Sequence, residues 1–412
     1  MQQTQGNPVL ENERADILDI LRGFALLGIL LANSAVFSFY VMQGPVISEG
    51  FFTAPVDKWL AWVHFALIDG KFYSLFSLLF GIGFSIIFLR NQASGRNGIV
   101  IFYRRLFILF VFGLIHGLLI WDGDILLFYA IVGAFLPLFS NVKDRTLLVL
   151  VVMLLLFPIV FDLLKVVSDG RISVSKPFLD AAIARDKVIG LSEESAGNWL
   201  IMNKDYNHIL DWNSSGILFG WFLRMDSNRP VKVLAMFLLG LYVGRHQIFM
   251  RLKENKVLLK KVQLFGFVLG IPAGILHAYF ELDETRLPAL AGLWDTIFYA
   301  LNVAPLALGY VATIALWYVN GKLKTLLLPL RHVGRMALTN YMMQSVIAIM
   351  IYYGIGMGLG AKFGPALFMP IAICVFIMQV IYSKIWMSYF NYGPLEWIWR
   401  MLTYGKILPI KK

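Results

Sequence analysis

The sequence predicts an all-α polytopic membrane protein with about ten transmembrane helices, on three observations. Hydrophobic residues make up 59% of the 412 residues and charged residues only 15%, whereas soluble proteins carry about 25% charged residues. The apolar residues occur in runs of about 20, the length that an α-helix needs to cross a bilayer. Basic residues gather in every second loop between these runs. This composition excludes soluble, disordered, fibrous and disulfide-scaffold proteins, and the single Cys374 cannot form an internal disulfide.

We expect ten membrane-spanning helices, of which the fourth is short. Their predicted ranges are 18–40, 72–90, 101–120, 124–140, 145–167, 230–247, 257–280, 295–319, 332–353 and 366–388. The turn at 121–123 is tight, so the third and fourth helices should form an antiparallel hairpin. The predicted organisation is therefore a cytoplasmic segment (1–17), a single transmembrane domain (18–390) and a cytoplasmic interfacial helix with a basic tail (391–412).

Five clusters of basic side chains predict the orientation of these helices. In chain order they are Arg90, Arg96, Arg104 and Arg105; Lys143 and Arg145; Arg245, Arg251, Lys253, Lys256, Lys260 and Lys261; Lys322, Lys324 and Arg331; and Lys406, Lys411 and Lys412. Because cytoplasmic loops carry the excess of Lys and Arg, both termini should be cytoplasmic. The net charge of +11 then belongs to loops that face anionic lipid, and nucleic acid is not an expected partner.

Short interfacial helices are expected on the external side. Residues 57–69 are too few to cross a bilayer and carry two tryptophans, which is typical of a helix lying at the interface. The longest polar loop is 168–212, followed by an amphipathic piece at 213–225. We expect the loop to lie outside and to cover part of the external opening. The N-terminal run is not expected to be a cleavable signal, because residues 1–17 are polar and Arg22 interrupts the apolar run.

Placing an ionisable side chain at the centre of a membrane helix costs a free energy of roughly 2.5 kcal/mol or more. Such residues are therefore functional candidates. Arg105 and His116 are eleven residues apart, which places both on one face of a helix about 16 Å apart along its axis. This spacing predicts a polar track with His116 as a general base, and the alternative is a buried imidazole that bonds a neighbouring helix. Asp122 and Asp124 follow directly and could orient the imidazole. The alternative for Asp124 is a cap of the fourth helix.

Other cations near the membrane edge are candidate ligands for an anionic cofactor. Arg22, Arg105 and Arg335 are each near the inner boundary, and we expect them to converge on one cytoplasmic-side cavity, where guanidinium groups suit phosphate. Lys71 is a further candidate of this kind. Asp19 lies one turn from Arg22, and an interfacial ion pair is the alternative for these two.

Several remaining polar or small residues are predicted to serve packing. Asn33 lies eleven residues after Arg22 in the first helix, the same spacing that separates Arg105 from His116 in the third. Gly81 lies in a glycine-containing stretch of the second helix, and Asn340 in a polar series at the start of the ninth. His64 on the interfacial helix is the second candidate for the functional histidine. Glu396 and Arg400, one turn apart, are interpreted as an interfacial anchor.

The sequence resembles the YeiB family, bacterial inner-membrane proteins with a domain of unknown function. The resemblance covers nearly the whole chain and rests on five stretches: RGFALLGILLAN from Arg22, Lys71-Phe72 with LFGIG from Leu79, HGLL with WDGDIL from His116 and Trp121, GRMALTNY from Gly334, and GPLEW from Gly393. The family is similar in helix organisation to membrane acyltransferases, including heparan-alpha-glucosaminide N-acetyltransferase and the acyltransferase-three proteins. Members of that wider group use cytosolic acyl-CoA and an embedded histidine. The acyltransferase-three proteins carry an Arg-x10-His spacing in their first helix, which occurs here in the third.

The resemblance implies an acyltransferase of the bacterial inner membrane that moves an acyl group from cytosolic acyl-CoA to an extracytoplasmic glycan, lipid or small molecule. The alternative is a transporter of a small anionic solute or peptide, with the same arginines and glycine-broken helices, and a third is an accessory subunit without chemistry. The expected partners are membrane lipid, the acyl donor and the acceptor, and a homo-oligomer is compatible with the sequence. The histidines are scattered, so no metal is expected.

Overall fold

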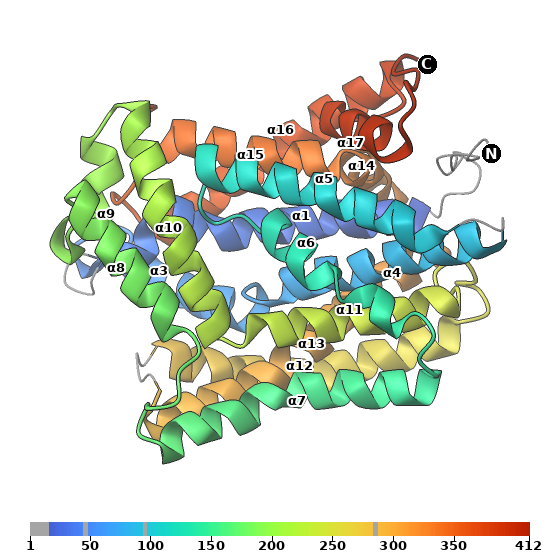
Figure 1. The fold of residues 1–412 in the computed structure, drawn as a ribbon, viewed down its shortest axis with the longest axis horizontal. Helices are drawn as coiled ribbons and strands as arrows, with labels where there is room; N and C mark the ends of the chain where they lie inside the picture. Colours follow the sequence, from blue (N-terminus) through green and yellow to red (C-terminus); the bar gives the residue numbers. More distant parts are fainter. Residues whose placement is uncertain (1–15, 44–47, 94–96, 283–286) are drawn as a thin grey trace.

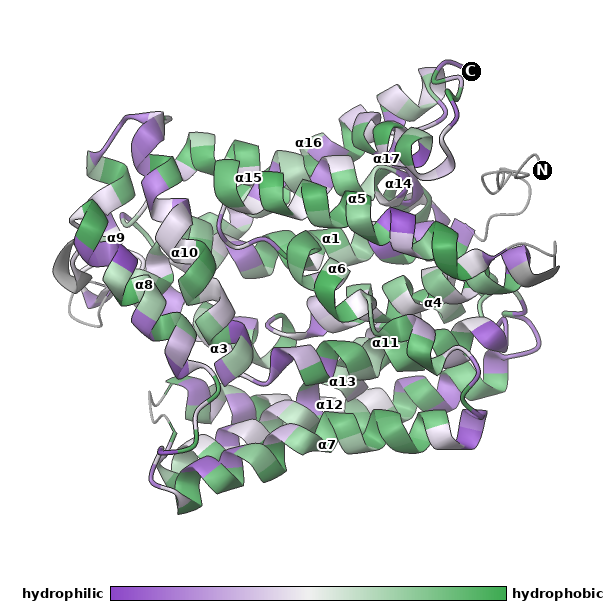
Figure 2. Ribbon diagram, viewed as in Figure 1, coloured by the Kyte–Doolittle hydropathy of each residue, from purple (hydrophilic) through white to green (hydrophobic). Residues whose placement is uncertain are grey.

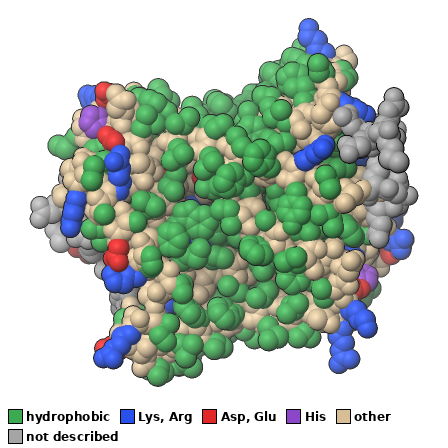
Figure 3. Space-filling model, viewed as in Figure 1, with side chains coloured by type: hydrophobic (Ala, Val, Ile, Leu, Met, Phe, Trp, Pro, Cys, Tyr) green, Lys and Arg blue, Asp and Glu red, His purple; other side chains and the backbone are tan. Residues whose placement is uncertain are grey.

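The computed structural model describes residues 16–43, 48–93, 97–282 and 287–412. Within these residues the chain is helical without a named strand, which confirms the predicted all-α membrane fold. The long helices run roughly side by side between two ends of the molecule (Figure 1). Hydrophobic residues dominate the middle of the helices, and hydrophilic residues concentrate toward the two ends (Figure 2). On the face drawn in Figure 3, charged side chains likewise lie mainly at the ends and leave an apolar band between them.

Seven stretches of the described chain are long and apolar enough to cross a membrane. They comprise α1 (Asp16–Phe37), α3 with α4 (Ala54–Leu67 and Lys71–Ala93), α5 (Gly98–Leu119), α7 (Asp144–Val167), α12 (Lys256–Leu282), α13 (Leu290–Val319) and α16 (Pro365–Tyr389). Three further predicted segments form shorter helices: α6 (Leu126–Gly133), α11 (Arg229–Arg245) and α15 (Ala337–Tyr352). At 1.5 Å per residue, α11 and α15 extend about 25 Å, slightly less than a typical hydrocarbon core.

Two predicted spans are broken. The fourth, 124–140, ends as an α-helix at Gly133 and continues as the 3-10 helix η3 (Leu136–Phe139), which contains Pro137. The ninth, 332–353, is divided at Met336 into α14 (Lys324–Arg335) and α15, because Met336 has non-helical torsions. The break directs α14, an amphipathic helix with Arg331 and Arg335, away from the axis of α15.

The ends of the molecule carry the shorter elements. The predicted external loop contains two helices, α8 (Lys176–Ile189) and α9 (Glu193–Met202), and α10 (Tyr206–Asp226) follows. These lie at the end of the molecule opposite to α17 (Pro394–Tyr404), and a second 3-10 helix, η2 (Tyr40–Met42), follows α1. The predicted interfacial helix at 57–69 is formed as α3. The first turns of α1 lie at the same end as α17, as an even number of crossings requires (Figure 1).

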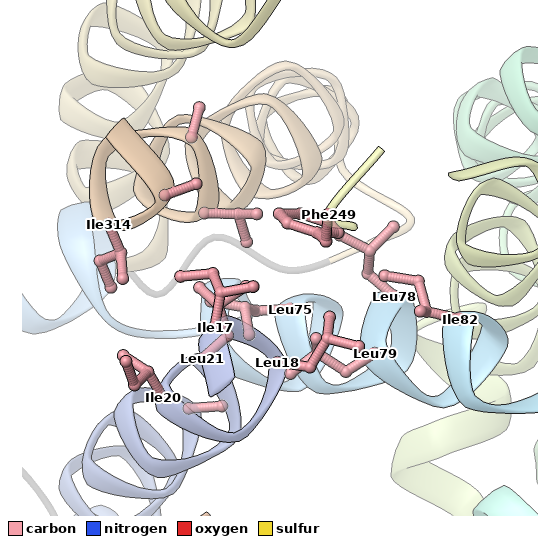
Figure 4. Packing of buried hydrophobic residues seen from close by; sticks show 14 of the residues in the cluster. Ile17, Leu18, Ile20, Leu21, Leu75, Leu78, Leu79, Ile82, Phe249 and Ile314 are labelled. Atoms are coloured by element: carbon pink, nitrogen blue, oxygen red, sulfur yellow. The ribbon is translucent and has the colours of Figure 1, made fainter. Parts of the chain in front are cut away.

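The main core joins the start of α1 to α4 and α13. Leu75, Leu78, Leu79 and Ile82 are buried along one face of α4, where spacings of three and four residues repeat. They pack with Ile17, Leu18 and Leu21 of α1, and with Ile314 of α13 (Figure 4). This core fixes α1 and α4 relative to each other, and both helices contribute to the cavity described below.

Close backbone contact between α4 and α11 depends on two glycines. A Cβ atom on Gly81 would lie 2.1 Å from the carbonyl oxygen of Phe237, and one on Gly240 would lie 2.2 Å from that of Leu78. Both distances are far below van der Waals contact, so the two backbones can approach this closely only without side chains. The packing role predicted for Gly81 therefore has a specific partner, α11.

The predicted topology can be tested by labelling single cysteines in a Cys374→Ser background. Lys187 is exposed on α8, so a cysteine at this position should react in intact cells with a maleimide that does not cross membranes. A cysteine at Lys406, beyond α17, should react only after the cells are permeabilised. Labelling of the 406 position in intact cells would reverse the orientation or change the number of crossings.

Candidate functional site

A cavity of about 290 Å³ lies between α1, α4, α5, α15 and α17. Among the described residues, its charged lining consists of Asp19, Arg22, Arg105, Arg335, Glu396 and Arg400. Four guanidinium groups and two carboxylates leave an excess of two positive charges. The three arginines expected to converge therefore do line one cavity, together with a fourth, Arg400, for which an anchoring role was expected.

The arginines are held in place by aromatic rings and backbone carbonyls. The guanidinium of Arg105 lies 4.4 Å from the centroid of the Trp399 ring, and the indole Nε1 of Trp399 donates to the carbonyl oxygen of Arg105 (3.1 Å). Arg400 lies over Tyr392 at 4.9 Å. Arg335 donates to the carbonyl oxygen of Asn391 (3.3 Å). Stacking on a ring orients the guanidinium groups of Arg105 and Arg400 without neutralising them, so these two charges suit an anion.

The two carboxylates of the cavity have different partners. Asp19 pairs with Arg22, one turn away on α1. Glu396 accepts hydrogen bonds from the backbone N–H groups of Leu338 and Thr339 (2.6 and 3.0 Å) and from the hydroxyl of Thr339 (2.7 Å). Burial raises the pKa of Glu396, while these donors act in the opposite direction. Glu396 is thus a cap on the first turn of α15, and the structure does not pair it with Arg400 as the sequence suggested.

His116 lies completely buried at the external end of α5, between two polar partners. Its Nδ1 is 2.9 Å from Oδ1 of Asp124, and its Nε2 is 2.9 Å from Oγ of Ser345 on α15. An ionised carboxylate only accepts hydrogen bonds, so Nδ1 carries the proton and Nε2 accepts from the serine hydroxyl. The three side chains form a Ser–His–Asp chain, an arrangement in which histidine can take the proton of a serine hydroxyl.

Asp124 is fixed by the turn that joins α5 to α6. Its second carboxylate oxygen accepts from the backbone N–H of Leu127 (2.6 Å), and its carbonyl oxygen accepts from Arg224 of α10 (2.6 Å). Gly113 permits this hairpin, because a Cβ there would lie 2.2 Å from the backbone nitrogen of Leu127. Asp124 therefore both caps α6 and orients His116, which were the two alternatives for this residue.

Asp122 points elsewhere. Its carboxylate faces α10, where a Cβ on Gly216 would lie 2.2 Å from Oδ2. Burial raises the pKa of Asp122 to about 6, against the opposing effect of Arg224. Of the two aspartates proposed for catalysis, the structure joins only Asp124 to His116 by a hydrogen bond.

The end of the cavity farthest from the arginines lies beside His116. Tyr341 and Ile125 line the cavity, and the Tyr341 ring centroid is 5.1 Å from that of His116. The hydroxyl of Tyr341 accepts from the backbone N–H of Ile125 (3.2 Å). Ser345 follows Tyr341 by one turn on α15. A ligand anchored at the arginines would therefore extend toward the Ser345–His116–Asp124 group.

The remaining predicted site residues lie outside the cavity lining. Lys71 begins α4 at the opposite end from the arginines, fully buried, and donates to the carbonyl oxygen of Phe65 (2.7 Å). Lys71 does not line the arginine cavity, so the structure does not bring it together with Arg22, Arg105 and Arg335. Asn33 is half-buried in the outer part of α1. Asn340 donates to Val333 and Ser383 (3.2 and 3.0 Å), as expected of a packing residue.

His64 belongs to a second buried polar region near Lys71. It is 6% exposed, and its Nδ1 has no hydrogen-bond partner among the described residues. The charges of His64, Lys71, His277 and Arg229 all act on Asp69. This region lies beside α12 and α13 and is separate from the Ser345–His116–Asp124 group.

Two residues of the site, Ser345 and Arg224, stand in polar stretches of the sequence but were not predicted to belong to the site. Ser345 belongs to the polar series of α15, which was interpreted as interhelical hydrogen bonding. Arg224 lies in the amphipathic piece before α11 and is buried against Asp124. Neither could be connected to His116 without the arrangement of α5, α10 and α15.

Comparison with known proteins extends over nearly the entire chain. The chain is 34% identical to the uncharacterized protein YxaH of Bacillus subtilis (strain 168), over 98% of each protein. It is 31% identical to the uncharacterized protein YeiB of Escherichia coli (strain K12), over 95% of this chain and 96% of YeiB.

The chain belongs to the YeiB family. Residues 243–406 also match a family model described as a protein of unknown function (DUF418). This part of the YeiB-family chain contains Arg335, Tyr341, Ser345, Glu396 and Arg400 but not His116. No solved structure matches the chain.

Proposed function

We propose that this YeiB-family protein is an acyltransferase of the bacterial inner membrane. It transfers an acyl group from cytosolic acyl-CoA to an extracytoplasmic glycan, lipid or small molecule. The observation that supports this most directly is the arginine cavity, which ends beside a buried Ser–His–Asp chain. The cavity offers guanidinium groups for phosphates at one end, and at the other it is lined by Tyr341, which packs against His116.

The donor would bind with its phosphates at Arg22, Arg105, Arg335 and Arg400. Guanidinium groups form charge-assisted hydrogen bonds with phosphate oxygens, and Trp399 and Tyr404 add aromatic faces to the same wall. Along α5, the eleven residues from Arg105 to His116 span about 16 Å. That distance is comparable to the reach of an extended phosphopantetheine arm, so the thioester would arrive near Tyr341 and Ser345.

Transfer would proceed in two steps through Ser345. His116 Nε2 accepts the proton of the Ser345 hydroxyl as Oγ attacks the thioester carbon. The carbon–sulfur bond breaks, and the CoA thiolate takes the proton back from His116. An acceptor hydroxyl or amine then attacks the serine ester, gives its proton to His116, and Ser345 leaves with that proton. Two steps allow the donor and the acceptor to approach from different sides of the membrane.

The test is acyl transfer by the purified protein in detergent or liposomes. Acetyl-CoA with a labelled acetyl group is supplied with lipid and glycan extracts as acceptors, and free CoA thiol is measured. Label in an acceptor together with released CoA supports the proposal. Absence of acyl-CoA binding at millimolar concentrations would refute it and favour transport of another anionic solute.

Substituting Arg105 with glutamine should weaken acyl-CoA binding more than it slows chemistry. Loss of one charge-assisted hydrogen bond is worth about 1.5–3 kcal/mol, or roughly 10–100-fold in affinity. The matched control is Arg104→Gln, because Arg104 is the adjacent residue, is exposed and does not line the cavity. Equal acyl-CoA affinities of the two variants, measured by calorimetry, would contradict the role of Arg105.

A further inference from the structure

A second cluster of ionisable side chains lies at the end of α12 and α13 opposite to the arginine cavity. His277 and Glu281 are one turn apart near the end of α12, and Asp295 is near the start of α13. Nδ1 of His277 is 2.6 Å from Oδ1 of Asp295. One potential ligand atom from each of the three residues lies within 4.8 Å of the others.

Rigid packing between the two helices holds these residues together. A Cβ on Gly266 would lie 2.5 Å from the carbonyl oxygen of Pro305, and one on Gly270 would lie 2.8 Å from Cβ of Leu306. Both glycines place α12 against α13 over several turns below the cluster. Residues that are distant along the sequence are thereby fixed on facing surfaces, as a metal site requires.

The imidazole of His277 is buried and faces the carboxylate of Asp295. Its side chain is 2% exposed, and Nε2 has no hydrogen-bond partner among the described residues. Its Nδ1 faces Asp295 at 2.6 Å, so an ion bound by both residues would take the place of the proton between these two atoms. Glu281 and Asp295 are half-buried, so the cluster is accessible from the end of the molecule.

We propose that His277, Glu281 and Asp295 bind a divalent first-row transition metal ion, of which zinc is the representative case. One imidazole nitrogen with two carboxylates suits zinc or manganese better than calcium or magnesium, which favour oxygen ligands alone. Three protein ligands leave at least one coordination position for water or another ligand. The ion would lie between two carboxylates that each offer an oxygen atom within 4.8 Å of the other.

Two nearby ammonium groups also act on this cluster. Lys71 and Lys232 both interact electrostatically with Asp295. Lys71, however, donates to the carbonyl oxygen of Phe65 (2.7 Å), and Lys232 lies 4.0 Å from the Tyr299 ring centroid. Among the described residues, the ion pair of Asp295 is with His277 rather than with either lysine.

The test is zinc binding by the full-length protein after treatment with a chelator. Zinc is added, excess is removed, and bound metal is measured by mass spectrometry, with affinity from a competing indicator dye. The wild type should retain about one zinc ion per chain. Glu281→Gln, which keeps size and hydrogen bonding, should weaken zinc binding by at least about 10-fold, and His277→Ala by about 100-fold.

His246→Ala is the matched control. His246 also forms a His–Asp pair, with Asp144 at 2.9 Å, but belongs to no described group of three ligands. This variant should bind zinc like the wild type. Absence of bound zinc in the wild type, or equal affinity in Glu281→Gln and the wild type, would overturn the metal site. Because the readout is metal content, this result is independent of acyl transfer.

Discussion

Replacing Ser345 with alanine or His116 with glutamine should reduce acyl transfer by about 10²–10⁴-fold, the usual contribution of a general base acting on its nucleophile. Both residues are buried, and their only described polar partners in this chain are each other and Asp124. Glutamine preserves a polar side chain beside Asp124, so its buried carboxylate is not left without a donor. Each variant should still insert into the membrane, since neither side chain contributes to hydrophobic spanning.

The measurement combines steady-state transfer with trapping of the acylated protein. Wild-type protein incubated with labelled acetyl-CoA and no acceptor should acquire label on Ser345, and Ser345→Ala should not. Asp124→Asn should lower transfer strongly, whereas Asp122→Asn should have a small effect, because only Asp124 bonds to His116. Full turnover by Ser345→Ala would exclude the acyl-serine route, and full turnover by His116→Gln would exclude His116 as the base.

Substituting Gly81 with alanine should lower the free energy of unfolding by about 1–3 kcal/mol, the usual effect of inserting an atom into a filled core. The added Cβ would lie 2.1 Å from the carbonyl oxygen of Phe237, and a backbone atom cannot move aside as a flexible side chain can. The two helices α4 and α11 would have to separate, and the core around Phe237 would loosen with them.

Gly83 provides a control two residues along the same helix. A Cβ there meets nothing within 4 Å, and alanine favours a helix more than glycine does by about 1 kcal/mol. Gly83→Ala should therefore have a neutral or stabilising effect in a thermal unfolding experiment in detergent. A Gly81→Ala variant as stable as Gly83→Ala would show that the contact between α4 and α11 is not a constraint on the fold.

The orientation of the arginines could be predicted because it depends on position along each helix alone. Arg105 and Arg335 each lie near a basic loop, and Arg22 lies near the N-terminus, which the positive-inside rule places on the same side as these loops. Side chains that share a depth and cannot face lipid cheaply must face the interior, so they converge. This reasoning does not extend to Lys71, because Lys71 begins α4 at the end opposite to the arginines.

The partners of His116 depended on tertiary structure. The sequence places Asp122 and Asp124 equally close to it, and only the geometry of the turn decides that Asp124 faces the imidazole while Asp122 faces α10. Ser345 is 229 residues away along the chain, and no periodicity connects α5 to α15. His277 and Asp295 are joined in the same way, by the packing of two helices.

The sequence by itself determined the class of protein, the placement of its apolar helices and the end at which its cations gather. These properties follow from the free energy of transferring residues from water to lipid. Each residue contributes to that free energy almost independently of the others. Tertiary structure alone decided where two helices break, that the external segment is helical, and which polar groups meet inside the bundle. Those outcomes depend on contacts between helices, where a glycine such as Gly81 or a hydrogen bond such as that of Ser345 selects one arrangement among many with the same burial.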